Sequence, residues 1–160
     1  MDHRIRRGLQ IRLPGAPRQT IGDDRRVASA GVLSSDYPGM RPEVLVTEGD
    51  AVGLGAPLFQ DRHRQEILIT APMAGQVARI EIGARRRLAW IEITATDATP
   101  APVVFDSSGT DACAVEGAMQ TSGLWAAFRT RPFGRVPDPG ARPDAIFVTA
   151  MDTEPLAADT

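Results

Sequence analysis

Few side chains in this sequence could take part in acid–base, nucleophilic or metal chemistry. The sequence contains two histidines, His3 and His63, and a single cysteine, Cys113. The histidines are far apart and have no neighbouring cysteine, so their spacing does not predict a zinc site. Asp152 and Glu154 are close in sequence, but no base or nucleophile can be matched to them. We therefore expect no catalytic residue and no metal ligand in this chain.

The composition is that of an ordinary soluble protein. Of the 160 residues, 42% are hydrophobic and 24% are charged, and the net charge is −2. This charge argues against nucleic-acid binding over the whole chain. No apolar run approaches the ~20 residues that a membrane span needs, and the amino terminus lacks the apolar core of a signal peptide. We expect a soluble, cytoplasmic chain, and the 15 glycines and 13 prolines favour a β-rich fold with many turns.

The middle of the chain has the alternation of half-buried strands. We expect strands at "ILIT" (67–70), "GQVARIEI" (75–82) and "LAWIEIT" (88–94), each separated from the next by a glycine-containing turn. An earlier strand, 43–52, runs into a turn at Gly49. The part of the chain around residues 44–59 and the part around residues 75–93 each have a strand, a glycine-containing turn and a second strand. Two such parts facing each other predict a flattened barrel of short strands, and hence a mainly β fold.

The last third of the sequence has a different pattern. Residues 98–122 are rich in Pro, Ser, Thr and Asp, which is typical of a linker. Ser122 is a plausible N-cap of a helix, and "AIFVTAM" (145–151) predicts a buried strand. The predicted organisation is N-terminal strands packing on the barrel (1–26), the barrel (27–97), a linker (98–122) and the beginning of an α/β domain (123–160).

Two segments resemble biotinyl and lipoyl carrier domains. They are "EGDAVGLGAPLF" (48–59) and "APMAGQV" (71–77), which in that family frame a hairpin whose tip carries a modified lysine. Here the tip falls at Arg62, His63 and Arg64, with Arg64 about where the lysine would be. All 18 basic residues of the sequence other than histidine are arginines, and a guanidinium is not a nucleophile for the attachment reaction. The resemblance therefore implies a barrel-sandwich hybrid fold with no covalently bound cofactor.

A second resemblance covers nearly the whole chain, from about Gly8 to Asp159. The motifs that carry it occur in one order along the sequence: "GAPRQTI", "DYPGMRP", "TAPMAG", "SGLWAAFRTRPF" and "AIFVTAMDT". Together they are similar to the amino-terminal part of the A subunit of the sodium-translocating NADH:quinone oxidoreductase (Na⁺-NQR). This family has a barrel-sandwich domain at its amino terminus, so both resemblances imply the same fold.

The second resemblance implies a function at the level of a complex. It implies a non-catalytic, structural or assembly role in a bacterial complex that passes electrons from NADH to ubiquinone and exports sodium. NAD and ubiquinone would be ligands of the complex, and this family has been linked to quinone binding. The partners would be the other subunits, with this chain bound peripherally on the cytoplasmic side of the inner membrane.

One surface is a candidate for meeting a partner or a quinone headgroup. Arg129, Arg131 and Phe133 place basic and aromatic side chains together in "FRTRPF". The alternative is that the phenylalanines pack inside and the arginine stems cover them. The run "GARRR" (83–87) could likewise bind acidic surfaces or lipid headgroups, or be a solvated turn. A stand-alone lipoyl-like adaptor is the alternative function, although an adaptor built only on the barrel has no need of residues 122–153.

Overall fold

The protein is described by a computed structural model that places residues 13–15, 18, 20, 22, 26–97 and 100–149. Residues Arg26–Arg142 form one compact unit, and residues Met1–Arg25 with Pro143–Thr160 form another. Almost all of the predicted N-terminal strands of 1–26 lie outside the described residues. Within the part that is described, every strand belongs to the compact unit Arg26–Arg142.

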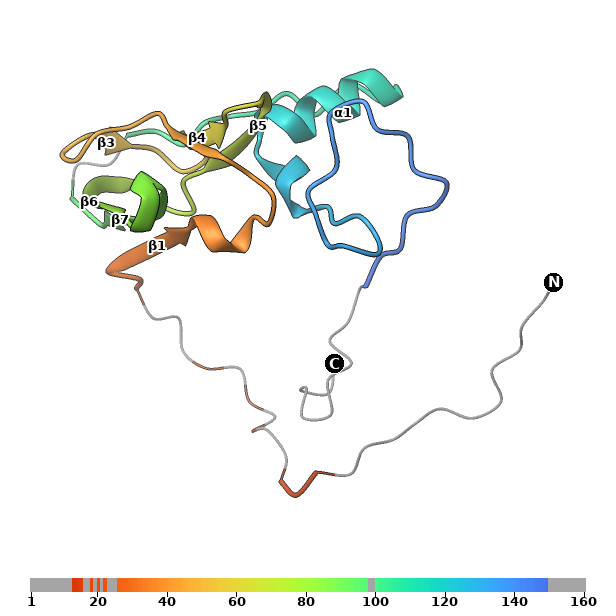
Figure 1. Cartoon of the computed structure of the whole chain (residues 1–160). Coiled ribbons are helices and arrows are strands. Elements are labelled where there is room, and N and C mark those ends of the chain that lie inside the picture. The colour runs from red at the N-terminus through yellow and green to blue at the C-terminus, as the bar shows by residue number, and fades with distance from the viewer. Residues whose placement is uncertain are drawn as a thin grey trace. The chain divides into compact units, whose positions relative to one another are not determined.

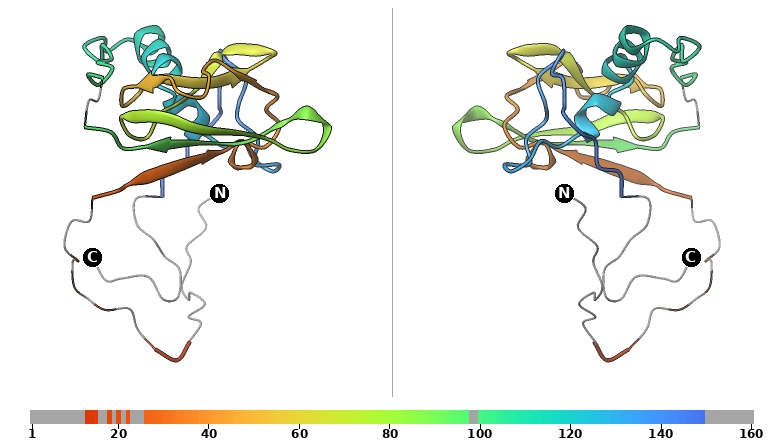
Figure 2. Two further views of the ribbon diagram at one scale, coloured as in Figure 1. Left: turned by 90° about the vertical axis from the view of Figure 1, so that its left-hand side faces the viewer. Right: turned by 90° about the vertical axis from the view of Figure 1, so that its right-hand side faces the viewer.

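Two antiparallel sheets face each other across a hydrophobic core (Figures 1 and 2). The larger sheet has the strand order β1-β7-β6-β3, and the smaller has the order β2-β4-β5. The strands are β1 (Ser29–Leu33), β2 (Pro42–Val44), β3 (Ala51–Val52), β4 (Pro57–Asp61), β5 (Arg64–Thr70), β6 (Gly75–Ile82) and β7 (Leu88–Thr94). The predicted barrel-sandwich hybrid fold and its mainly β class are confirmed.

The core is formed by the apolar positions of the alternating strands. Leu58, Phe59 and Ile67 of the small sheet and Ile91 and Ile93 of the large sheet are completely buried. The predicted alternation breaks near the end of β6, where the register with β7 shifts. Such irregularities turn the following side chains, and Ile82 is consequently 49% exposed.

The chain after the barrel covers the edge of the smaller sheet. Helix α1 (Ala112–Thr121) and the 3-10 helix η3 (Leu124–Ala127) both contact β5. Gly123, between them, has a φ of +80°, and a β-carbon there would lie 3.0 Å from the Thr70 hydroxyl. Glycine is therefore required for both the turn and the close approach. Trp125 belongs to the same buried cluster as the barrel residues.

Two predictions for the last third of the chain are wrong. The helix begins after Asp111, whose carboxylate accepts hydrogen bonds from the backbone N–H groups of Cys113 and Ala114, and Ser122 is its C-cap. Residues 112–121 are thus helical, and they lie within the stretch 98–122 of the predicted domain division. The described part of the predicted strand, 145–149, has no regular structure, and Phe147 is 90% exposed. A buried strand needs neighbouring strands, and none among the described residues pairs with this segment.

Candidate functional site

The tight turn between β4 and β5 lies where the sequence predicts the tip of a carrier hairpin. Arg62 and His63 form the turn, Asp61 is the last residue of β4, and Arg64 is the first residue of β5. A two-residue turn between antiparallel strands brings its flanking residues together. Asp61 and Arg64 are accordingly paired in the register of the two strands.

Asp61 is the only charged residue that is buried among the described residues, with 2% of its surface exposed. Its carboxylate accepts hydrogen bonds from Arg64 Nε at 3.0 Å and Arg64 Nη2 at 2.6 Å. The backbone N–H of His63 donates a third, at 3.0 Å. Both arginine nitrogens donate to Oδ2, and the His63 N–H donates to Oδ1, so each oxygen of the carboxylate has a partner that offsets the cost of its burial.

The remaining nitrogen of Arg64 reaches the segment that follows η3. Nη1 donates to the carboxylate of Asp138 at 2.7 Å and to the carbonyl of Val136 at 3.3 Å. The side chain of Asp138 is 78% exposed, whereas that of Arg64 is 22% exposed. All three guanidinium nitrogens of Arg64 therefore have partners, and the barrel turn is tied to residues 136–138.

The electrostatics of this group favour the ionised forms. Burial raises the pKa of the Asp61 carboxyl, but hydrogen bonds from His63 and Arg64 outweigh it, so the pKa lies below its usual value. For Arg64, burial lowers the pKa, whereas the hydrogen bonds to Asp61 and Asp138 raise it above the usual value. An arginine held in this way stays protonated and offers no nucleophile.

The residues predicted as a partner or quinone surface, Arg129, Arg131 and Phe133, differ in their surroundings. Arg129 donates hydrogen bonds to the carbonyls of Ala126 and Phe128 and, at 2.9 Å, to that of Asp36. Its guanidinium thus holds together parts of the backbone that are distant in sequence. Arg131 is exposed and Phe133 is 77% exposed, so the alternative in which the phenylalanine packs inside does not describe this position.

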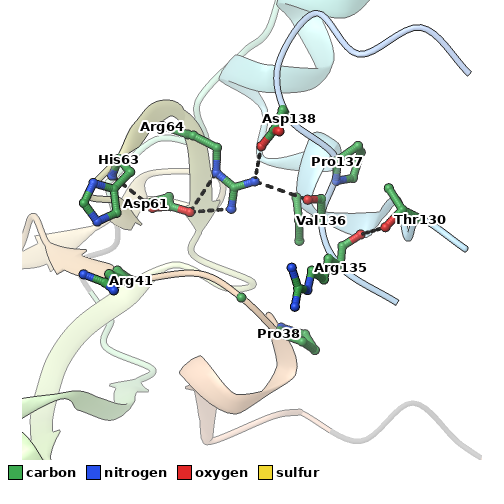
Figure 3. Close-up of a pocket in the computed structure, with 11 residues that line it drawn as sticks. Pro38, Arg41, Asp61, His63, Arg64, Thr130, Arg135, Val136, Pro137 and Asp138 are labelled. Carbon is green, nitrogen blue, oxygen red and sulfur yellow. Dashed lines mark hydrogen bonds and ion pairs between the residues drawn. The ribbon is translucent and has the colours of Figure 1, made fainter. Parts of the chain in front are cut away.

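A pocket of about 300 Å³ lies between the β4–β5 turn and the segment after η3 (Figure 3). His63 and Arg64 line it on one side, and Thr130 and Arg135 line it on the other. The predicted hairpin tip and the segment that contains the predicted partner surface therefore both contribute residues to one pocket. Arg62, Arg129, Arg131 and Phe133 do not line it.

Sequence reasoning missed four of the charged residues at this pocket, namely Arg41, Asp61, Arg135 and Asp138. Asp61 and Arg64 are three positions apart, on either side of the turn, and this spacing is a signal that could have found Asp61. Nothing in the spacing of Arg64 and Asp138 indicates that they meet. Among the described residues, no group of three His, Cys, Asp or Glu side chains could hold a metal ion.

Comparison with known proteins identifies the family to which this chain belongs. A family model for the NqrA N-terminal barrel-sandwich hybrid domain matches residues 3–96. The chain belongs to the NqrA family. A second model, for the NqrA second alpha/beta domain, matches residues 110–160. The family resemblance seen in the sequence is therefore confirmed, and so is the expectation that the barrel is followed by the start of an α/β domain.

Individual NqrA relatives agree with the family match. Proteins from Yersinia pseudotuberculosis and Rhodopirellula baltica, both named as the A subunit of the Na(+)-translocating NADH-quinone reductase, are 42% and 40% identical to this chain. The corresponding protein from Neisseria meningitidis is 41% identical. Each match covers 98% of this chain and 36% of the relative. The chain thus spans about a third of the length of the curated relatives it matches.

The described part of the structure contains no helix that is both long enough and apolar enough to cross a membrane.

Proposed function

We propose that this chain is the amino-terminal part of the NqrA component of a Na⁺-translocating NADH-quinone reductase and has a structural, assembly role there. It is a non-catalytic portion of the complex. NAD and ubiquinone are ligands of the whole complex, whose other subunits are the partners of this chain at the cytoplasmic side of the membrane. The names and coverage of the relatives support this assignment.

The observation that carries the structural role is the fixed hairpin tip. A carrier domain needs a free lysine on an accessible turn, so that the attached group can move between sites. Here the corresponding position is Arg64, whose guanidinium is held by Asp61 and Asp138. The barrel fold is therefore used as a rigid packing unit and not as a swinging arm.

We further propose that Arg131 and Phe133 contribute to a quinone-proximal or partner-facing surface. Both side chains are exposed, and the Arg135 guanidinium lies 5.8 Å from the centre of the Phe133 ring. An exposed aromatic ring beside cations suits a flat, polar-edged group such as a quinone head. Arg129 acts differently in this proposal, because its hydrogen bonds to backbone carbonyls position the segment that carries the other two residues.

The experiment that tests the assembly role is an immunoblot of the native gene product in soluble and membrane fractions of its own cells. A membrane-bound band much larger than 17.1 kDa, copurifying with quinone-dependent NADH oxidation, is expected. Deletion of the gene should abolish that activity, and complementation should restore it. A soluble band near 17.1 kDa, with no effect on NADH oxidation, would contradict the proposal and favour the stand-alone adaptor.

A further inference from the structure

One end of the barrel carries most of the arginines of the compact unit. Four segments contribute to it, and we call this surface the basic end. It consists of residues 34–41, the β4–β5 turn with its flanking residues 61–64, the β6–β7 turn 83–87, and the segment 128–138. The arginines in these segments are Arg41, Arg62, Arg64, Arg85, Arg86, Arg87, Arg129, Arg131 and Arg135, and the acids are Asp36, Asp61 and Asp138. The segments are strongly positive, although the chain as a whole has a net charge of −2.

Contacts join these segments to one another. The pocket at the β4–β5 turn includes Arg41, Arg64 and Arg135, so three of the four segments meet there. The fourth is joined through the 3-10 helix η1 (Ser34–Asp36), because the Ser34 hydroxyl donates a hydrogen bond to the carbonyl of Leu88, just after the β6–β7 turn. Both views in Figure 2 place the β4–β5 and β6–β7 turns at the same end of the sheets.

Most of the charge at the basic end is not neutralised internally. Asp61 and Asp138 both pair with Arg64, and the guanidinium of Arg129 is bound to backbone carbonyls. Among the described residues, no ion pair involves the remaining seven arginines of this surface. A surface of unpaired cations attracts a partner that carries many negative charges.

The β6–β7 turn presents its arginines away from the barrel. Arg85 and Arg86 both have a positive φ, of 59° and 57°, which is unfavourable for residues with a side chain. The turn is closed by a hydrogen bond of 2.8 Å from the backbone N–H of Gly83 to the carbonyl of Arg87. Its three arginine side chains are exposed, and Figure 2 shows the turn projecting beyond the sheets.

Exposed apolar side chains accompany these arginines. Ile82, directly before the β6–β7 turn, is 49% exposed, and Phe133 is 77% exposed. Proteins that lie on a bilayer commonly combine basic residues, which bind anionic headgroups, with apolar side chains that enter the interface. A complementary acidic protein surface would use the charges but would not require an exposed phenylalanine between them.

We propose that the basic end binds the surface of a membrane that contains anionic phospholipids. The unpaired arginines of the turns and of segment 128–138 contact headgroup phosphates, and Phe133 and Ile82 enter the interface. This inference goes beyond the assembly role and does not depend on it, since it concerns contact with lipid, but it shares Arg131 and Phe133 with the proposed quinone-proximal surface.

The test is cosedimentation of the whole 160-residue chain with vesicles. Binding is expected to vesicles of phosphatidylglycerol mixed with phosphatidylcholine, and not to vesicles of phosphatidylcholine alone. Binding should weaken as salt is added, because surface charges are screened. Each charge close to the surface changes the affinity about fivefold, so Arg86→Glu, which changes the charge by two units, should weaken binding more than tenfold.

A matched control separates a specific face from a general charge effect. Arg26→Glu makes the same change in net charge on an exposed residue shortly before β1, and β1 reaches the basic end only at Leu33, beside η1. It should change the affinity by less than about threefold. Phe133→Ser tests the apolar contribution without changing the charge, and it should also weaken binding.

Several outcomes would overturn the proposal. One is equal binding to both kinds of vesicle, and another is an equal loss of affinity in Arg86→Glu and Arg26→Glu. A third is binding of a labelled hexaglutamate peptide that phosphatidylglycerol vesicles do not compete away, which would indicate an acidic protein partner instead. Because the other subunits are left out of this experiment, each of these results leaves the assembly role to be judged by its own test.

Discussion

Arg64 and Asp138 are 74 positions apart in the sequence, yet Nη1 of the first lies 2.7 Å from Oδ1 of the second. The same guanidinium pairs with the buried carboxylate of Asp61. One side chain therefore ties a turn of the barrel to the chain that follows η3. The two ion pairs differ in exposure, which leads to different expectations for their removal.

Replacing Asp61 should be costly, whereas replacing Asp138 should not. Asp61→Asn leaves Arg64 without its buried counterion, so we expect a loss of about 2 kcal/mol in the free energy of unfolding. Asp138 is 78% exposed, and Asp138→Asn should cost less than about 1 kcal/mol. Urea titration of both variants measures the difference. Equal losses would mean that burial of Asp61 does not determine the strength of the pair.

The contribution of Asp61 should disappear in acid. Its pKa in the folded state lies below the usual value, so the stabilisation is present above the unfolded pKa of about 3.9 and is lost as the pH falls through the folded value. The difference in unfolding free energy between the wild type and Asp61→Asn should be constant near neutral pH and should shrink below about pH 4. A difference that stays constant into strong acid would contradict this assignment.

Gly123 should be sensitive to substitution and Gly117 should not. A β-carbon at Gly123 would meet Thr70 and the Leu68 carbonyl, and its φ is +80°. We expect Gly123→Ala to destabilise the compact unit by about 1–3 kcal/mol. Gly117 lies within α1, and an added β-carbon there would have no atom within 4 Å apart from the adjacent helix backbone, so Gly117→Ala should be neutral or slightly stabilising. Thermal unfolding of the two variants compares them directly.

Restoring a lysine should not restore a carrier. The wild type has no lysine, so coexpression with a biotin or lipoate ligase should leave its intact mass unchanged. We expect Arg64→Lys to remain unmodified as well, because the new ammonium would lie beside Asp61 and the segment of residues 136–138. A mass increase on Arg64→Lys would show that this segment does not restrict access to the turn.

The quinone proposal predicts an effect of Phe133 on the activity of the assembled complex. Loss of its exposed ring in Phe133→Ala should raise the KM for ubiquinone about fivefold, the equivalent of one aromatic contact. Leu124→Ala, another exposed apolar position at 58%, is the control and should leave the KM unchanged. Steady-state NADH oxidation at varied quinone concentrations measures both. An unchanged KM in Phe133→Ala would remove this residue from the proposed surface.

The strands were predictable because their signal is local. The alternation in 75–82 and 88–94 follows from the period of a sheet with one buried face, and β6 and β7 occupy those residues. A turn at Pro38–Gly39 also has a local signal, because a Pro-Gly pair is typical of a type II turn. Gly39 has a φ of +88°, and the backbone N–H of Met40 donates a hydrogen bond to the carbonyl of Tyr37.

The helix and the pocket were not predictable in the same way. Asp111 and Ser122 are both suitable N-cap residues, and propensity alone did not separate the one that caps from the one that ends the helix. The pocket depends on long-range pairing, since Asp138 reaches Arg64 only after α1 and η3 have packed on β5. The residues proposed for partner or quinone contact, and the division into domains, stay predictions.

The packing of Trp125, Ala126 and Val136 into the barrel core has a consequence for how this protein can be divided. The two family matches, 3–96 and 110–160, suggest modules that could be exchanged or expressed one at a time. The buried cluster and the covered edge of β5 cross that boundary. A cut between the two matches would expose apolar surface on both pieces. The barrel and residues 110–142 should therefore be kept on one polypeptide when the protein is divided.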